Sequence, residues 1–348
     1  MKRTAAISAA ILAGICFFLF TQTPLPAQRA DPASPSILNL LMVTDNLDKA
    51  EEFYHRLLGL ESNTGDPRAR LVWYAESPFL DDIYRHKGDS RNFALRTPGS
   101  ELGLEIEQFR EVKGKRLNTH LQDPGALQLI FTVNNIDILT GWLTKGGAKV
   151  LTAGAKPVAV KYGDSTARAI LFQDFNGFFV QLVQPDGPPP GPGVNGAPPN
   201  SYVTGVTIAI AVEDTEKTAR YYREVLGVDV KTDSPFMDDA KQIDVFGLKG
   251  AQYRESVAAL PAKTPQLHFL EFKGVERKAL RPEVADPNSI LVRFDIHDIN
   301  KFVTRVKSAG GEIVNQSGGP SVNGKTLVLV AKDPNGVHSQ FFERNILP

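Results

Sequence analysis

Apolar positions along the chain follow one pattern that occurs four times. Each copy is an apolar strand, then an Asn or Asp, then apolar positions three and four residues apart, then a glycine. The four strands cover residues 37–43, 127–133, 206–212 and 290–296, and the residues that follow them are Asn46, Asn135, Asp214 and Asp298. An Asn or Asp oxygen in this place accepts hydrogen bonds from the first backbone N–H groups of a helix, and glycine ends a helix. Each copy therefore predicts a strand followed by a capped helix with one buried stripe.

Further strands are predicted near the ends of the second and fourth copies. Apolar runs at 167–172 and 178–183 enclose an Asp-Phe-Asn-Gly turn, and runs at 327–331 and 338–342 enclose Asp-Pro-Asn-Gly. Asn-Gly between two apolar runs is a strong hairpin signal. With one more strand after each helix, every copy becomes a module of strand, helix and three strands. The predicted class is α+β, with helices on one face of each sheet and a cup on the other.

The four modules fall into two similar halves. The caps Asn46 and Asp214 are separated by the same offset as the helix-terminating Gly59 and Gly227. Residues 187–200, between the halves, are rich in proline and glycine and predict a linker, because such a stretch cannot form a regular ladder. The sequence thus predicts that each half closes its own lobe. The first lobe would cover 36–186, with modules 36–112 and 121–186, and the second 201–346, with modules 201–276 and 287–346.

Composition narrows the class of protein. The chain has 348 residues, a size typical of two domains, and its 42% hydrophobic and 22% charged residues are those of a folded protein. Lys plus Arg and Asp plus Glu are each 39, so there is no basic excess for binding nucleic-acid phosphates. The single cysteine, Cys16, excludes an intramolecular disulfide. We therefore expect neither a nucleic-acid partner nor a disulfide framework.

The first residues match a secretion signal. Lys2 and Arg3 precede a largely apolar run over residues 5–20, and the small residue Ala27 follows a proline. The run is shorter than the roughly 20 residues that a membrane span needs. We therefore expect residues 1–27 to be removed and the rest to be exported, to a periplasmic or extracellular compartment, without integral membrane contact. An uncleaved N-terminal anchor is the alternative.

Paired strand–helix–three-strand modules, with Asp-Pro-Asn-Gly before the last strand, resemble the vicinal oxygen chelate family. Its members include glyoxalase I, extradiol dioxygenases, fosfomycin-resistance enzymes and bleomycin-binding proteins. Residues 53–59, with Phe-Tyr and Leu-Leu-Gly, and residues 221–227, with Tyr-Tyr and Val-Leu-Gly, are similar to the family's helix signature. The resemblance covers nearly all of residues 36–346 and implies two glyoxalase-like, cup-shaped lobes, each built from two βαβββ modules.

The resemblance also implies where a metal would bind. In metal-dependent members each cup takes ligands from first strands, usually a histidine seven residues before the helix cap, and from last strands, usually a glutamate. The first-strand positions here are Asn39, Gln128, Thr207 and Leu291, and the last-strand positions are Glu105, Gln181, His268 and Gln340. If each half closes its own cup, the first cup holds Asn39, Glu105, Gln128 and Gln181, and the second holds Thr207, His268, Leu291 and Gln340. None of the first-strand positions is a histidine.

Glu105 and Arg293 are charged side chains that we expect to face the cups. Glu105 is flanked by leucine and isoleucine, so strand alternation turns it toward the cup, where a carboxylate needs a partner. Neighbouring amide groups, a ligand or a divalent ion at Glu105 would each supply one. Arg293 lies on the cup side of its own strand, where it either pairs with an internal Asp or Glu or binds an anion together with His268.

These residues predict a metal-poor or metal-free protein that binds a small molecule in its cups and needs no cofactor. The expected ligand-binding residues are Asn39, Glu105, Gln128, Gln181, His268, Arg293 and Gln340, and no catalytic residue stands out. The alternative is a divergent metal-dependent enzyme of the family, of lyase, isomerase or dioxygenase type, with its ion on Glu105.

The exported protein should begin near Gln28, because the basic and apolar segments end in a cleavable pattern at Ala27. N-terminal sequencing of the protein from culture medium or periplasm is expected to start within a few residues of Gln28. A membrane-bound product that retains Met1 would contradict this expectation.

Overall fold

The computed structural model describes residues 35–62, 72–112, 114, 116–187, 201–258, 260 and 266–344. The expected secretion signal and all but the first residue of the expected linker lie outside these ranges. The described residues all belong to one compact unit. None of their helices is long and apolar enough to span a membrane.

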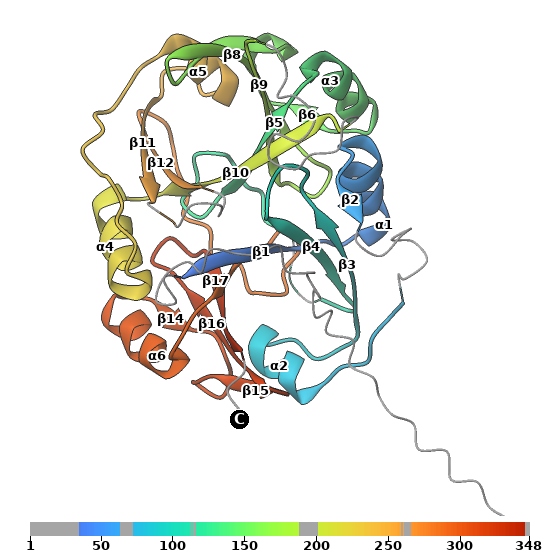
Figure 1. The fold of residues 1–348 in the computed structure, drawn as a ribbon, viewed down its shortest axis with the longest axis vertical. Helices are drawn as coiled ribbons and strands as arrows, with labels where there is room; N and C mark the ends of the chain where they lie inside the picture. The colour runs from blue at the N-terminus through green and yellow to red at the C-terminus, as the bar shows by residue number, and fades with distance from the viewer. Residues whose placement is uncertain are drawn as a thin grey trace, which may run out of the picture. The chain divides into compact units, whose positions relative to one another are not determined.

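Seventeen strands of the described chain form two sheets (Figure 1). In spatial order, sheet A contains β14 (Glu312–Ile313), β16 (Thr326–Lys332), β17 (His338–Arg344), β13 (Ile290–Asp295), β1 (Ser36–Val43), β4 (Gly103–Phe109), β3 (Ser90–Arg96) and β2 (Glu61–Ser62), with β15 (Ser321–Asn323) beside β16. Sheet B contains β11 (Gln252–Ala258), β12 (Leu267–Lys273), β10 (Val203–Val212), β5 (Leu127–Val133), β9 (Phe179–Pro185), β8 (Ser165–Gln173) and β6 (Lys149–Val150), with β7 (Val158–Tyr162) beside β8. The predicted α+β class with four modules in two sheets is confirmed.

The grouping of the modules differs from the expected one. β1 of the first module pairs antiparallel with β13 of the fourth, and β5 of the second pairs antiparallel with β10 of the third. In Figure 1 the blue strands of the first module accordingly share a sheet with the red strands of the fourth. The expectation that 36–186 and 201–346 would each close their own lobe is therefore wrong. All four first strands are alike in sequence pattern, so local periodicity shows that they pair but not with which partner.

The four predicted helices are present. They are α1 (Leu47–Ala50), which continues as the π-helical segment η1 (Glu51–Leu57), and α3 (Ile136–Lys145), α4 (Thr215–Leu226) and α6 (Ile299–Ser308). Asn46, Asn135 and Asp214 accept capping hydrogen bonds from backbone N–H groups, as predicted. Asp298 does not cap α6: its backbone is left-handed, and Glu343 instead accepts hydrogen bonds from the backbone N–H groups that begin this helix.

Two short helices were not predicted from the sequence. α2 (Pro78–Tyr84) begins at the Ser77 cap, and α5 (Ala240–Phe246) begins at the Asp239 cap. Each covers the face of a sheet that is turned away from the other sheet, α2 over sheet A and α5 over sheet B. The 3₁₀ turn η3 (Ala153–Ala155) lies near α5. Both cups are thus covered by apolar side chains of a short helix.

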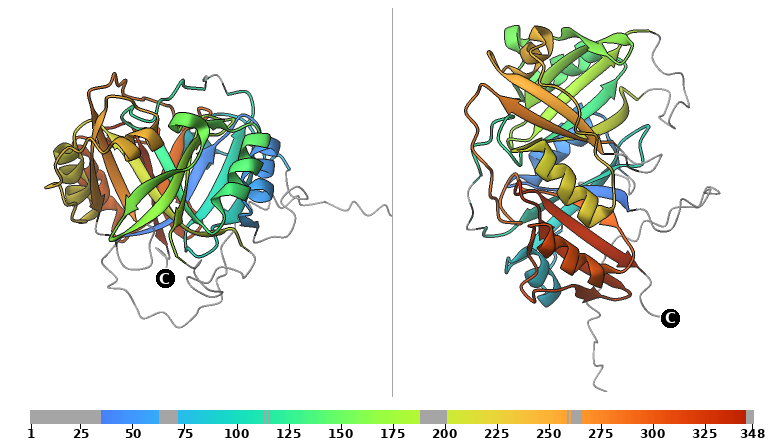
Figure 2. Two further views of the ribbon diagram at one scale, coloured as in Figure 1. Left: turned by 90° about the horizontal axis from the view of Figure 1, so that it is seen from above. Right: turned by 90° about the vertical axis from the view of Figure 1, so that its left-hand side faces the viewer.

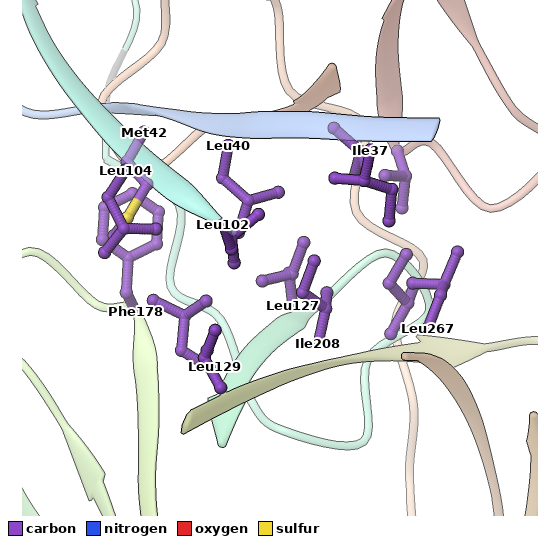
Figure 3. Packing of buried hydrophobic residues seen from close by; sticks show 14 of the residues in the cluster. Ile37, Leu40, Met42, Leu102, Leu104, Leu127, Leu129, Phe178, Ile208 and Leu267 are labelled. Atoms are coloured by element: carbon purple, nitrogen blue, oxygen red, sulfur yellow. The ribbon is translucent and has the colours of Figure 1, made fainter. Parts of the chain in front are cut away.

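The main core lies between the two sheets. Figure 3 shows Leu40 and Met42 of β1 and Leu104 of β4 on one side, and Leu129 of β5 and Ile208 of β10 on the other. Each of these five side chains is at most 1% exposed. The long helices flank this core, with α4 packed against α6 and α3 against η1 (Figure 2). Burial of one such side chain stabilises a fold by about 1.5–3 kcal/mol. The two sheets are therefore held together by the apolar side chains on the faces that they turn toward each other.

The two Asp-x-Asn-Gly turns lock the sheets together at their ends. Asp174, in the turn before β9, accepts a hydrogen bond of 2.9 Å from the Tyr54 hydroxyl of η1. Asn176 of the same turn donates to the carbonyl of Val43 at the end of β1. In the fourth module Asn335 occupies the matching place and accepts a hydrogen bond from the backbone N–H of Glu213, after β10. The turn of the second module, in sheet B, thus bonds to the first module, in sheet A. The turn of the fourth module, in sheet A, bonds to the third module, in sheet B.

Cutting the chain within residues 188–200 should not release two independent folded halves. Each sheet draws strands from both halves, so the ladders β1–β13 and β5–β10 would have to break before the halves could separate. With a protease site inserted there, the cut protein is expected to elute at the size of the intact chain and to separate only in denaturant. Residues 28–190 expressed alone should show no cooperative unfolding transition. A stably folded, monomeric first half would contradict the observed strand pairing.

Candidate functional site

Cup A is the face of sheet A that α2 covers. Leu40 and Met42 enter the core between the sheets, so alternation turns Asn39 and Leu41 of β1 toward this cup. The other strands contribute residues in register with them: Glu105 and Glu107 of β4, Leu291 and Arg293 of β13, and His338 and Gln340 of β17. The cup-facing direction predicted for Glu105 is thus confirmed. Apolar side chains of α2 fill the outer part of the cup.

The guanidinium of Arg293 is the centre of cup A. The Arg293 side chain is 7% exposed and forms an ion pair with Glu105 through Nη1. Its Nε donates a hydrogen bond of 2.7 Å to Oε1 of Gln340, and its Nη2 donates one of 3.2 Å to the hydroxyl of Tyr84. Of the two roles open to Arg293, pairing with an internal acid is the one observed. Each guanidinium nitrogen has a partner within the cup, which a buried cation requires.

Glu107 is a second, fully buried carboxyl in cup A. Burial and, to a smaller extent, the charge of Glu105 together raise its pKa to about 8, although Arg293 acts in the opposite direction. Two carboxylates and one guanidinium cannot all be matched, so one carboxyl keeps its proton. Glu105, which has the direct ion pair, is the charged one, and Glu107 is protonated at neutral pH.

His338 lies deep in cup A and is neutral. Burial, together with the positive charges of Lys332 and Arg85, lowers its pKa to about 3. Its Nδ1 lies 3.4 Å from the hydroxyl of Ser289, while its Nε2 has no hydrogen-bond partner among the described residues. Oδ1 of Asn39 likewise has no partner in the described part of the chain, although this residue is only 9% exposed. The polar floor of cup A is therefore only partly satisfied by the protein itself.

Cup B is the face of sheet B that α5 covers. Alternation turns Gln128 and Ile130 of β5, Gln181 of β9, and Thr207 and Ala209 of β10 into it, with His268 of β12 alongside. Nε2 of Gln128 donates a hydrogen bond of 2.5 Å to Oε1 of Gln181. Gln128 is 1% exposed, yet its own Oε1 has no hydrogen-bond partner among the residues that the structure describes.

His268 and Glu255 form a pair at the side of cup B. Nδ1 of His268 lies 2.5 Å from Oε1 of Glu255, and Nε2 lies 3.1 Å from Oε1 of Gln266. The His268 side chain is 16% exposed, whereas that of Glu255 is 41% exposed. The pair therefore stands where the cup opens to solvent.

The structure brings the candidate residues together in two sets, but not in the expected ones. Asn39, Glu105, Arg293 and Gln340 share cup A, and Gln128, Gln181, His268 and Thr207 share cup B. The expectation that Asn39, Glu105, Gln128 and Gln181 converge on one floor is wrong, because the first two lie in sheet A and the last two in sheet B. The register within each module is as predicted; only the pairing of modules differs.

Sequence reasoning missed three polar side chains of the cups. Glu107 follows Glu105 by two residues on the same strand face, so alternation could have found it. Glu255 lies diagonally opposite His268 on β11, a strand whose partner is not evident from sequence. Tyr84 lies on the unpredicted helix α2.

The metal positions implied by the family do not fit a divalent ion in either cup. In cup A the four positions are Asn39, Glu105, Leu291 and Gln340; leucine has no donor atom, and the Arg293 guanidinium bonds to both Glu105 and Gln340. In cup B they are Gln128, Gln181, Thr207 and His268; the two amides bond to each other, and Glu255 already engages the imidazole. Among the described residues, no three His, Cys, Asp or Glu side chains are grouped so that they could hold a metal.

Comparison with known proteins agrees with the fold. Residues 206–341 match the model of the Glyoxalase/Bleomycin resistance protein/Dioxygenase superfamily. Glyoxalase I from Zea mays superimposes with a TM-score of 0.54 at 17% identity, over 89% of this chain and 92% of that one. A putative dioxygenase from Bacillus subtilis superimposes with a TM-score of 0.52 at 10% identity, over 90% of this chain and 86% of that one. No curated protein sequence matches the chain significantly.

The match to the superfamily model covers residues 206–341, and the fold shared with these structures extends over both sheets, in agreement with the resemblance that the modules predicted. At these identities the structural similarity establishes the fold alone. What the cups do has to be argued from their own residues.

Replacing Glu107 with Gln should stabilise the protein at alkaline pH. Because the folded-state pKa of Glu107 is raised to about 8, the folded protein keeps a proton that the unfolded chain releases above its ordinary pKa of 4.5. Wild-type stability therefore falls as pH rises between these two values. Urea unfolding should show Glu107→Gln more stable than wild type at pH 8, by about 1–3 kcal/mol, with the difference vanishing near pH 4.

The exposed Glu101→Gln serves as the control and should follow the wild-type profile at every pH. Other buried acids, such as Asp174 and Asp333, contribute equally to all three proteins and cancel in the comparison. A pH-independent difference between Glu107→Gln and wild type would show that Glu107 is not the group that titrates.

Proposed function

We propose that the protein is an exported, metal-independent member of the superfamily that binds a small molecule in its cups. The observation that carries the proposal is the Arg293 guanidinium, which forms hydrogen bonds with Glu105 and Gln340 inside cup A. The export part rests on the pattern of residues 1–27 alone.

The charge balance of cup A supports metal independence. A divalent ion bound at Glu105 would lie beside a buried guanidinium, and like charges at such distances repel strongly in a low dielectric. The other carboxyl, Glu107, is protonated and so adds no negative charge. Cup A thus already contains the cation that its one carboxylate needs. A metal-dependent enzyme with its ion on Glu105 is opposed by the same observation.

Unsatisfied amide oxygens support the binding part. Oδ1 of Asn39 in cup A and Oε1 of Gln128 in cup B are both buried and lack partners within the described ranges of the chain. Both residues occupy the same place in their modules, seven residues before the helix cap. A buried acceptor without a donor costs about 1–3 kcal/mol. A bound molecule that donates an N–H or O–H would remove that cost.

Metal analysis of the purified chain from residue 28 onward tests the proposal. We expect less than about a tenth of a divalent ion per chain after purification without chelator, because the cups lack a charged ligand set. About one tightly bound ion per chain that is lost in Glu105→Gln would overturn it.

Urea unfolding of Arg293 variants tests the physical basis. Arg293→Met leaves Glu105 without its cation and should cost about 3–5 kcal/mol of unfolding free energy. In the double variant Arg293→Met/Glu105→Gln most of that loss should be recovered, because no unpaired charge remains. The exposed Arg305→Met is the control and should cost under about 1 kcal/mol. Additive effects of Arg293→Met and Glu105→Gln would show that the pair is not coupled.

A further inference from the structure

We propose that cup B, rather than cup A, holds the ligand, and that the ligand is an uncharged, partly apolar molecule that donates an N–H or O–H to Oε1 of Gln128. This inference rests on the proposed function and assigns it to one cup and one class of ligand.

The two cups differ at one matching position. In cup A, Arg293 lies directly across from Asn39 in the pairing of β13 with β1. In cup B, the residue across from Gln128 in the pairing of β10 with β5 is Ala209. Arg293 and Ala209 each lie two residues beyond the first-strand position of their module, so they are counterparts. The place that a guanidinium fills in cup A therefore carries only a methyl group in cup B.

The small side chain of Ala209 separates two polar groups. In register, Gln128 on β5 lies beside Ala209 on β10, which lies beside His268 on β12. Neighbouring strands are about 4.8 Å apart, so Gln128 and His268 stand about 10 Å from each other across Ala209. A group the size of a six-membered ring spans such a distance over an alanine.

The hydrogen-bonding state of Gln128 selects the chemistry of the ligand. Its Nε2 donates a hydrogen bond to Gln181. The residue is 1% exposed, and its Oε1 has no hydrogen-bond partner in the part of the chain that the structure describes. The atom that remains is an acceptor, so the ligand must be a donor at this end. Across the cup, the half-buried Thr207 carries a hydroxyl that can accept or donate, whereas Nε2 of His268 already lies 3.1 Å from Oε1 of Gln266.

The remaining surroundings favour an uncharged molecule with an apolar body. Phe179, Ala209 and Leu270 belong to the apolar cluster under α5, and half-buried Ile130 packs against it. Glu255, which is paired with His268, stands at the cup opening. Its carboxylate would repel an anion, and Gln128 and Gln181 offer no charge to compensate a buried cation.

Benzamide is a suitable probe, with benzoate and benzylamine as probes of the same shape but opposite charge. Binding to the full mature chain in EDTA is measured by the change in the His268 imidazole signals in NMR. We expect saturable benzamide binding with a Kd of about 1 mM, the affinity usual for a fragment of this size, and at least about tenfold weaker binding of both charged probes.

Two variants locate the site. Gln128→Met removes the acceptor at nearly constant volume and should weaken benzamide binding about tenfold or more. Ala209→Leu places a larger side chain across from Gln128 and should abolish it, provided that thermal unfolding remains cooperative. Gln316→Met, the same change at an exposed glutamine that donates a hydrogen bond to α2 on sheet A, should leave benzamide affinity unchanged. No saturable binding up to about 20 mM, equal binding of benzoate, or unchanged affinity in Gln128→Met would overturn the assignment.

The same titration with one equivalent of Zn²⁺ in place of EDTA separates the two proposals. Benzamide binding that appears only with Zn²⁺ would overturn metal independence. Absence of binding under both conditions would overturn the ligand assignment, while the metal content of the purified chain would still decide the proposed function.

Discussion

The pairing of first strands determines nearly everything else in this molecule. Each module presents the edge of its first strand, and an unpaired edge leaves a row of backbone donors and acceptors without partners. Here β1 pairs with β13, and β5 pairs with β10, so the backbone groups on these edges have partners. These two ladders decide which modules form a cup, and so which polar side chains meet. Arg293 reaches Glu105 because β13 lies beside β1, although the two residues come from opposite ends of the chain.

The contacts between consecutive modules explain why they do not share a sheet. The Asp-x-Asn-Gly turn of the second module is bonded to the helix and the first strand of the first through Asp174 and Asn176. These contacts place consecutive modules back to back, with their apolar faces in the common core. Burial raises the pKa of Asp174 to about 6, although Tyr54 and backbone N–H groups bond to it and oppose that shift. The junction between these modules thus contains a buried acid whose hydrogen bonds link the turn to the helix.

What could be predicted from the sequence is what depends on neighbours along the chain. Alternation gave the correct face for Glu105, and capping chemistry gave three of the four helix starts. Asp298 failed as a cap because Glu343, distant in sequence, takes that role. The partner of Arg293 and the cup of Gln128 depend on which module lies alongside, and four modules with the same pattern carry no local signal for that choice. The short helix α2, with Tyr84, was missed because its seven residues give too little periodicity.

Each sheet combines a module from the first half of the chain with one from the second half, and this affects folding during synthesis. When the first half has been synthesised, β1 can pair with β4 and β5 with β9, but one edge of each stays open because β13 and β10 have not yet emerged. The strand that completes sheet A beside β1 comes from the last module, so its closure waits for almost the whole chain. Pairing over such sequence separations is slow, and exposed apolar edges invite aggregation meanwhile. Closure of both sheets therefore depends on strands of the second half, and until these emerge a factor that shields strand edges would act on the first half.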